Sequence, residues 1–261
     1  MLDDLLKSAA LHESVVIPEG WGQGRATFGG LLAALMCSRL LHVVGEDRVL
    51  RSATVSFVGP VAPGTARLTV EVFRNGKSVT QAEARLYQDD EVLAVLLASF
   101  GATRPSRIVV PPVATAPVFK GPDDCHVTPY ISGVMPEFMQ HVDMRWAEGA
   151  MPFSGVNTPD FGGWMRYRSS VHQMTLTHLF GLIDCWPPAV LSMFTAPAPA
   201  SSMCWTIEFL HFPEDATADT WWQYQVRTDA SAEGYAHTEA NVWDDQGCLV
   251  AISRQTIAVF A

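Results

Sequence analysis

Ala53-Thr-Val-Ser-Phe-Val58 opens the stretch of sequence that decides the fold class of this 261-residue chain. It is the first of four extended runs, at 53–58, 66–73, 79–87 and 92–100. Turn signals separate these runs at Pro63-Gly64, Asn75-Gly76 and Asp89-Asp90. Such runs between tight turns are typical of antiparallel strands. Apolar residues at helical spacing precede them, from Phe28 to about Val44. The segment therefore predicts one helix followed by four strands.

The second half of the chain repeats this order. A helical pattern from Gln173 to about Cys185 ends at Pro187-Pro188, and extended runs follow at 204–209, 220–227, 236–242 and 249–260. Val55-Ser-Phe-Val58 matches Ile207-Glu-Phe-Leu210, and the run from Asp89 matches the run from Asp244, at offsets of 152 to 156 residues. Two matches at nearly one offset favour an internal repeat over two unrelated α+β domains.

A proline-rich segment lies between the two halves, with prolines at 105, 111, 112, 117, 122 and 129. Proline donates no hydrogen bond to a strand ladder, so the segment is expected to be a surface crossover. We expect a first domain at 1–104, a linker at 105–133 and a second domain at 134–261. A further strand is expected before each helix, near Gly24–Phe28 and near Trp164–Arg168.

Composition and charge restrict the partners and the compartment. The net charge is −10 and no basic run occurs, which argues against nucleic acid as a partner. The five cysteines are an odd number without a C-x-x-C pair, which favours a reducing compartment. The start, Met1-Leu-Asp-Asp4, is acidic where a signal peptide is basic, and Arg39 breaks the apolar stretch from Gly29 too early for a membrane span. A cytoplasmic protein is expected.

Five segments together resemble the acyl-CoA thioesterase II family of fused double hot-dog hydrolases. The resemblance covers nearly the whole chain and depends on the order and spacing of the segments at 27–30, 55–64, 178–184, 202–209 and 247–255. It implies an α+β fold of two tandem antiparallel sheets, each wrapped around a long helix. It also implies hydrolysis of acyl-CoA thioesters without a cofactor or metal, and we expect two such chains to associate as a homodimer.

The resemblance implies a hydrolytic trio in the second domain: Asp184, Gln255 and the hydroxyl of Ser202. Thr206 is the alternative hydroxyl, and Cys204 stands where the family has an acidic residue. Asp184 follows an apolar helical stripe, where burial would raise its pKa and make it a better base. Gln255 shares an apolar strand face with Ile257. Strict alternation places Ser202 on one face with Cys204 and Thr206. The structural alternatives are a helix-end Asp open to solvent, a buried Gln bound to backbone and an ordinary strand hydroxyl.

These groups would activate a water, while direct attack by Asp184 to give a mixed anhydride stays open as a second route. Gly29 and Gly30 would allow close approach of the substrate to backbone N–H groups. Arg74 and Lys77, beside a turn, are candidates for binding the CoA phosphates, as are Arg104 and Arg107. Ser99 and Cys37 or Ser38 stand at the corresponding first-half positions, so one competent site per chain is expected.

Two other functions compete with hydrolysis. Hot-dog hydratases or dehydratases use an Asp–His pair, but His178 is six residues before Asp184 and lies off its helical face. A non-catalytic acyl-CoA-binding protein is the third possibility, suggested by Cys204. No cluster of His and Cys has metal-ligand spacing, and Gly20-Trp-Gly-Gln-Gly24 lacks the pattern of a phosphate loop.

Overall fold

Residues 2–45, 47–168 and 171–260 are described by the structure, which is a computed structural model. The helices are α1 (Leu2–Leu11), α2 (Gly29–Val44) and α3 (Leu176–Ile183), with 3-10 turns η1 (Pro122–Asp124), η2 (Glu137–His141) and η3 (Ala189–Met193). The first-half strands are β1 (Ser14–Ile17), β2 (Gly22–Gln23), β3 (Ala26–Thr27), β4 (Val49–Phe57), β5 (Gly64–Asn75), β6 (Val79–Gln88) and β7 (Glu91–Gly101). The later strands are β8 (His126–Val127), β9 (Val142–Glu148), β10 (Phe161–Tyr167), β11 (Ala200–Phe209), β12 (Trp222–Ala232), β13 (Tyr235–Trp243) and β14 (Leu249–Val259).

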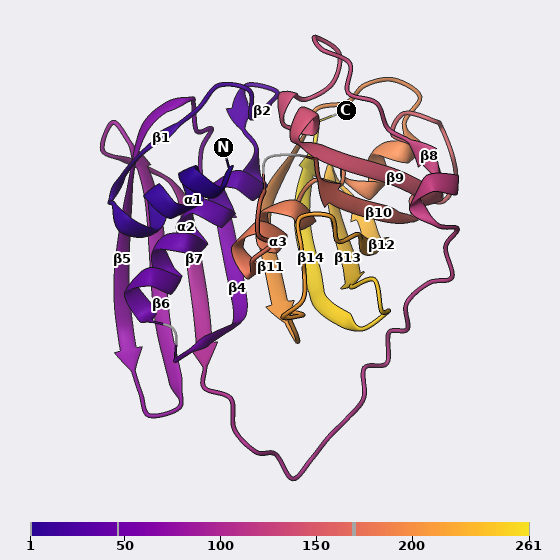
Figure 1. The fold of residues 1–261 in the computed structure, drawn as a ribbon. Coiled ribbons are helices and arrows are strands. Elements are labelled where there is room, and N and C mark those ends of the chain that lie inside the picture. The colour runs from indigo at the N-terminus through magenta and orange to yellow at the C-terminus, as the bar shows by residue number, and fades with distance from the viewer. Residues whose placement is uncertain (1, 46, 169–170, 261) are drawn as a thin grey trace.

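The four expected strands form in each half, and the two halves join edge to edge. Their order in a single twelve-stranded sheet is β1-β5-β6-β7-β4-β11-β14-β13-β12-β10-β9-β8. β4 pairs antiparallel with β11 at the junction, with Val55 opposite Trp205 and Ala53 opposite Ile207. Figure 1 shows these two strands side by side in the middle of the molecule. The two expected sheets therefore continue into one another through this junction.

Helix α2 forms the centre of the core. Most of its side chains are buried, and it contacts α1, α3 and the strands of the first half. α2 contains runs of Leu and Ala, strong helix formers, so local preference and burial act in the same direction. Helix α3 has eight residues, shorter than the expected 173–185, because Thr175 is extended and the helix ends at Ile183, before Pro187. Its side chains are mainly apolar, with Thr177 and His178 as the polar members, and all but Leu176 are buried.

Several elements differ from the expectation. The segment near Gly24–Phe28 does not join the main sheet: β2 and β3 form a separate two-stranded hairpin, and β1 pairs with β5 in its place. Helix α1 and strand β9 were not anticipated. β10 occupies the position expected near Trp164–Arg168. Residues 102–121 contain no helix or strand, while η1 and β8 follow within the proline-rich segment.

Candidate active site

Asp184, Gln255 and Ser202 meet on the helix-covered face of the sheet. The Gln255 Nε2 donates a hydrogen bond of 2.8 Å to Asp184 Oδ1, and the Ser202 Oγ donates one of 3.3 Å to Gln255 Oε1. The amide thereby joins the hydroxyl to the carboxylate in one chain. Each of the three residues keeps a minor part of its surface exposed to solvent.

Strand pairing explains why Gln255 points at the helix. Gln255 lies opposite Trp205 in the β11–β14 pair, and Trp205 is fully buried under Phe180 of α3. Paired residues of antiparallel strands point to the same face, so Gln255 faces the helices as well. The expected alternation on β14 is present, with Ile257 buried two residues further along.

A β-bulge decides which hydroxyl belongs to this site. The β11–β14 register shifts between Ser202 and Cys204, so Ser202 lies opposite Ile257 while Cys204 lies opposite Thr256. The extra residue in the bulge places Ser202 on the inner face, away from Cys204 and Thr206. The expectation that all three share a face is therefore wrong. Thr206 instead contacts Thr54 on the outer face, with 3.1 Å between the two Oγ1 atoms.

Asp184 lies where the end of α3 meets the beginning of α2. Its carboxylate accepts a backbone hydrogen bond from Gly30. A Cβ on Gly29 would lie 2.9 Å from Asp184 Oδ2, and a Cβ on Gly30 would lie 2.2 Å from the Gly181 carbonyl oxygen. The glycine pair is thus required for the close packing of α2 against Asp184 and α3. α2 has no acidic residue in its first turn, which leaves its positive end facing the site.

Burial raises the pKa of Asp184 from 3.8 to about 7, although the hydrogen bonds from Gln255 and Gly30 oppose the rise. Desolvation thus exceeds the stabilisation that two donors give the charged form. A carboxyl group with this pKa is partly ionised at neutral pH and can both take and return a proton. The helix-end position of Asp184 therefore does not leave it as a free surface carboxylate.

In the described part of the first half, the side chains at the corresponding positions do not form an equivalent set of groups. Ser99 points to the outer face, where its Oγ donates to Gln81 Oε1 at 3.1 Å, while the inward neighbour Ala98 lies opposite Ala53. Cys37 is fully buried, and burial raises the pKa of its thiol well above the usual range. Ser99 therefore cannot donate to a carboxylate on the inner face as Gln255 does, and Cys37 cannot act as a base near neutral pH as Asp184 can.

Arg74 and Lys77 are not brought to this site. Gly29 packs against the Phe57 ring, which marks the end of the sheet nearest the site. Phe57 lies opposite Ala94 on β7, and Ala94 lies opposite Leu86 on β6. Arg74 lies opposite Gln81, at the other end of the same sheet. Arg74 and Lys77 therefore stay a prediction that the geometry of a single chain does not support.

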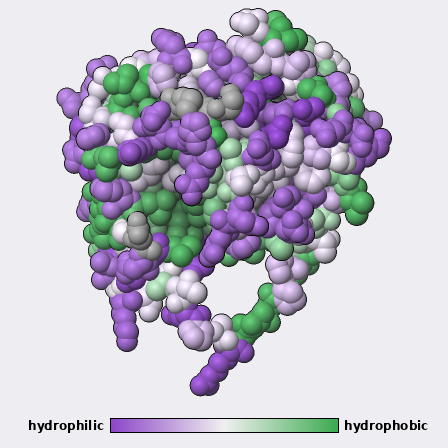
Figure 2. All heavy atoms as spheres, in the orientation of Figure 1, coloured by the Kyte–Doolittle hydropathy of each residue, from purple (hydrophilic) through white to green (hydrophobic). Residues whose placement is uncertain are grey.

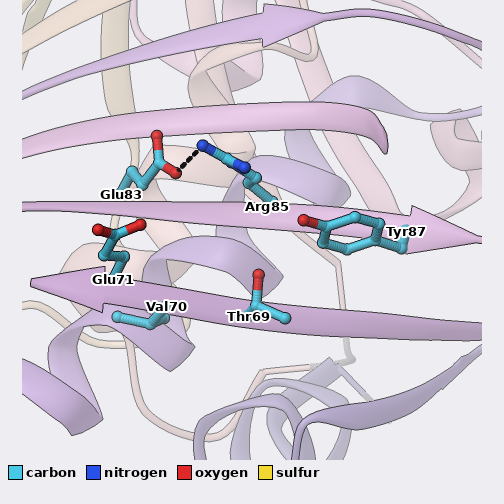
Figure 3. Close-up of a pocket in the computed structure, with 6 residues that line it drawn as sticks. All are labelled: Thr69, Val70, Glu71, Glu83, Arg85 and Tyr87. Atoms are coloured by element: carbon cyan, nitrogen blue, oxygen red, sulfur yellow. Dashed lines mark ion pairs between the residues drawn. The ribbon is translucent and has the colours of Figure 1, made fainter. Parts of the chain in front are cut away.

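The hollow in Figure 3 is separate from the trio. It measures about 340 Å³ and is lined by Thr69, Val70, Glu71, Glu83, Arg85 and Tyr87 on β5 and β6. Glu83 and Arg85 form an ion pair in it at 2.5 Å. None of the trio lines this hollow. Among the described residues, no three His, Cys, Asp or Glu side chains gather as metal ligands would.

Tyr167 is a positioning contact that the sequence did not reveal. Its hydroxyl donates to the His178 carbonyl of α3 at 3.1 Å and lies 3.1 Å from the Cβ that Gly181 would carry. His178 is itself bound on both nitrogens, at 2.8 Å to Asp3 Oδ1 and 2.6 Å to Thr175 Oγ1. These contacts hold α3, and with it Asp184, against β10 and α1.

Both halves of the chain match models of one protein family. Residues 17–101 match the acyl-CoA thioesterase N-terminal domain, and residues 122–259 match the acyl-CoA thioesterase C-terminal domain. The chain belongs to the acyl-CoA thioesterase family. This membership confirms the resemblance stated above and indicates thioester hydrolysis as its general activity.

Solved structures confirm the double hot-dog fold of this thioesterase family member. A conserved protein of unknown function with hot dog fold from Alicyclobacillus acidocaldarius is 23% identical, with TM-score 0.82 over 95% of this chain and 92% of that one. The tesB protein of Mycobacterium avium subspecies paratuberculosis is 16% identical, with TM-score 0.78 over 100% of both chains. An acyl-CoA thioesterase II from Mycobacterium marinum is 17% identical, with TM-score 0.71 over 95% and 93%. No curated protein matches the thioesterase chain by sequence.

Proposed function

We propose that this chain hydrolyses acyl-CoA thioesters to free acid and CoA with a water activated by Asp184. The observation that carries the proposal is the environment of one carboxyl group. Asp184 is buried enough to hold its pKa near 7, is hydrogen-bonded by Gln255, and lies at the amino end of α2. A base, an orienting amide and the positive end of a helix are the parts that water attack on a thioester needs.

In the proposed reaction, Asp184 takes a proton from water while the water oxygen bonds to the thioester carbon. The carbonyl oxygen becomes negative, and the positive amino end of α2 stabilises that charge. The carbon–sulfur bond then breaks, and Asp184 returns its proton to the leaving CoA thiolate. Gln255 holds the carboxylate through Oδ1, and Ser202 limits the orientations of the Gln255 amide. The hydroxyl and amide position the carboxylate and the water without forming a covalent bond.

Direct attack by Asp184 on the thioester is the competing route. A single turnover in ¹⁸O-labelled water reveals an anhydride that is opened by water at the carbonyl carbon of Asp184. Water attack places the label only in the released acid, whereas an anhydride opened at the enzyme carbonyl would leave label on Asp184.

Release of free thiol from acyl-CoA substrates of several chain lengths tests the activity itself. Asp184→Asn keeps the shape of the side chain and removes the base, so kcat should fall by about a hundredfold or more. Asp245→Asn, on an exposed turn, is the matched control and should retain full activity. A folded Asp184→Asn protein with near-normal turnover would contradict the assignment.

Among the described residues, Asp184 has no histidine partner, which argues against a hydratase at this site. Such an enzyme needs an Asp–His pair at the reacting carbons, and His178 is bound to Asp3 and Thr175 instead of Asp184. Adding a 2-enoyl-CoA to the substrate panel checks this: the thioester should be cleaved, and the double bond should not be hydrated.

A further inference from the structure

The segment between β7 and β8 presents a row of aliphatic side chains to solvent. Ile108, Val109 and Val110 are 78%, 85% and 77% exposed, and Val113 is 94% exposed. Figure 1 shows this segment as a long loop standing away from both halves of the sheet. In Figure 2 a green stretch of the same loop lies beside its hydrophilic tip. Contiguous exposed aliphatic residues of this kind mark an interaction surface.

Contacts at both ends hold this loop in place. At its beginning, the Ala102 N–H donates to the Ser78 carbonyl at 3.0 Å. At its end, the Trp164 Nε1 donates to the Lys120 carbonyl at 2.9 Å, and the Phe119 ring packs edge-on against the Trp164 ring. The aliphatic middle therefore projects from two anchored ends.

The local charge is opposite in sign to that of the whole chain. Between Glu91 and Asp123 the sequence has no acidic residue, while Arg104, Arg107 and Lys120 are all exposed. The protein as a whole carries a net charge of −10. A cationic loop on an acidic protein is directed toward an anionic surface and keeps the rest of the molecule away from it.

The backbone of this loop also suits a poorly hydrated environment. Pro105, Pro111, Pro112 and Pro117 have no N–H group, so fewer donors lose water when the loop enters an interface. Proline also keeps the chain extended and reduces the conformational freedom lost on binding.

We propose that residues 104–113 form a docking loop for an anionic lipid surface, with Ile108, Val109 and Val110 entering the headgroup boundary beside Arg104 and Arg107. Apolar insertion next to basic residues is the combination by which peripheral proteins hold anionic bilayers. The proposal is independent of the catalytic residues. Within the described ranges, no helix is long and apolar enough to cross a membrane.

Sedimentation of the full chain with lipid vesicles tests the docking loop in the absence of any substrate. Vesicles of phosphatidylcholine with about one quarter phosphatidylglycerol should carry the protein down, and pure phosphatidylcholine should carry about tenfold less. The double variant Val109→Asp, Val110→Asp should lose at least about tenfold in partitioning. Arg104→Gln with Arg107→Gln should weaken binding to the anionic vesicles and reduce its salt dependence.

Val134→Asp is the matched control because Val134 is equally exposed, at 77%, outside the docking loop. It should bind vesicles like the unchanged protein. Equal losses from Val134→Asp, or no sedimentation of the unchanged protein with either vesicle, would overturn the proposal.

Sedimentation equilibrium of the loop variants separates lipid from protein partners. The proposal expects the solution mass to be unaffected by the loop substitutions. A change of mass would instead assign the loop to contacts between copies and refute the lipid surface. Thiol release from a short-chain acyl-CoA in bulk solution should be unchanged in the double variant Val109→Asp, Val110→Asp, so loss of docking and loss of catalysis are distinguishable.

Discussion

The Gln255 amide nitrogen lies 2.8 Å from the Asp184 carboxylate, although 71 residues separate the two in the sequence. This donor opposes the rise in the Asp184 pKa that burial causes. Gln255→Glu replaces the donor with a second acidic group and should raise the Asp184 pKa above 7. The rate of the unchanged enzyme should fall about tenfold per pH unit below about 7. In Gln255→Glu the same fall should begin at higher pH, as measured by kcat/KM across pH.

Gln255→Ala is the control for the shift of the pH profile expected in Gln255→Glu. It removes the hydrogen bond without adding charge, so it should lower kcat while moving the profile less than Gln255→Glu does. An unchanged pH profile in both variants would contradict the role given to this amide.

Asp184 should cost the protein stability at neutral and alkaline pH. Its pKa is about 7 when folded and 3.8 in the reference state, so the folded state binds more protons between these values. The contribution is fully favourable below about pH 4 and is lost as pH rises through 7. Relative to Asp184→Asn, the unchanged protein should lose on the order of 4 kcal/mol of unfolding free energy from pH 4 to pH 8. Urea unfolding of both proteins at several pH values measures this difference.

The identity of the hydroxyl group can be tested by two substitutions. Ser202→Ala should depress kcat because Ser202 donates to Gln255, and Thr206→Val should have little effect because Thr206 contacts Thr54 on the other face. Steady-state thiol release compares them, with Ser99→Ala as the first-half control. A larger loss from Thr206→Val than from Ser202→Ala would reverse the assignment. Equal losses from Ser99→Ala and Ser202→Ala, in folded proteins, would indicate two working sites.

The two glycines at the start of α2 should respond differently to alanine. Gly29→Ala places a methyl group 2.9 Å from Asp184 Oδ2 and 3.0 Å from the Phe57 ring, so activity should fall in a protein that still folds. Gly30→Ala places one 2.2 Å from the Gly181 carbonyl, where the packed backbone cannot yield. Its main effect should be a loss of about 1–3 kcal/mol or more in stability. Thermal unfolding measures the stability of both variants, and thiol release measures their activity. If the two variants had equal effects on both measurements, the separate roles of Gly29 and Gly30 would be contradicted.

Cutting the chain near Ala114 should leave the two halves associated. The backbone ladder between β4 and β11, together with the α2–α3 contact, crosses from one half to the other without using the linker. Size-exclusion chromatography of the nicked protein should therefore show one species of unchanged size. Two separate peaks would mean that the halves are not one structural unit.

The helix-and-four-strand order of both halves was predictable because it depends on local periodicity and turn residues. The meeting of Asp184 with Gln255 could be expected from family resemblance, since no short-range pattern brings two residues so distant together. The face of Ser202 was not predictable: alternation assumes an unbroken ladder, and the bulge at 202–204 depends on pairing with a strand about fifty residues later.

Other differences also have physical causes. α1 packs on α2 and is stabilised by tertiary contact, so a short ten-residue pattern gave little local signal. The strand expected near Gly24–Phe28 was replaced by β1 because pairing with β5 extends the sheet, whereas β2 and β3 pair only with one another. The outward direction of Ser99 follows from the register of β7 with β4 and β6.

The junction of β4 with β11 has a consequence for how the protein behaves at high concentration. β4 has nine residues and β11 has ten, and each would be an exposed edge strand if the two halves were separate. In the intact chain these two strands pair with each other. The ends of the combined sheet are β1, with four residues, and β8, with two. Exposed edge strands can pair with strands of other molecules, and short edge strands do so poorly. Pairing β4 with β11 within one chain thus replaces two long exposed strand edges with two short ones, which favours resistance to aggregation.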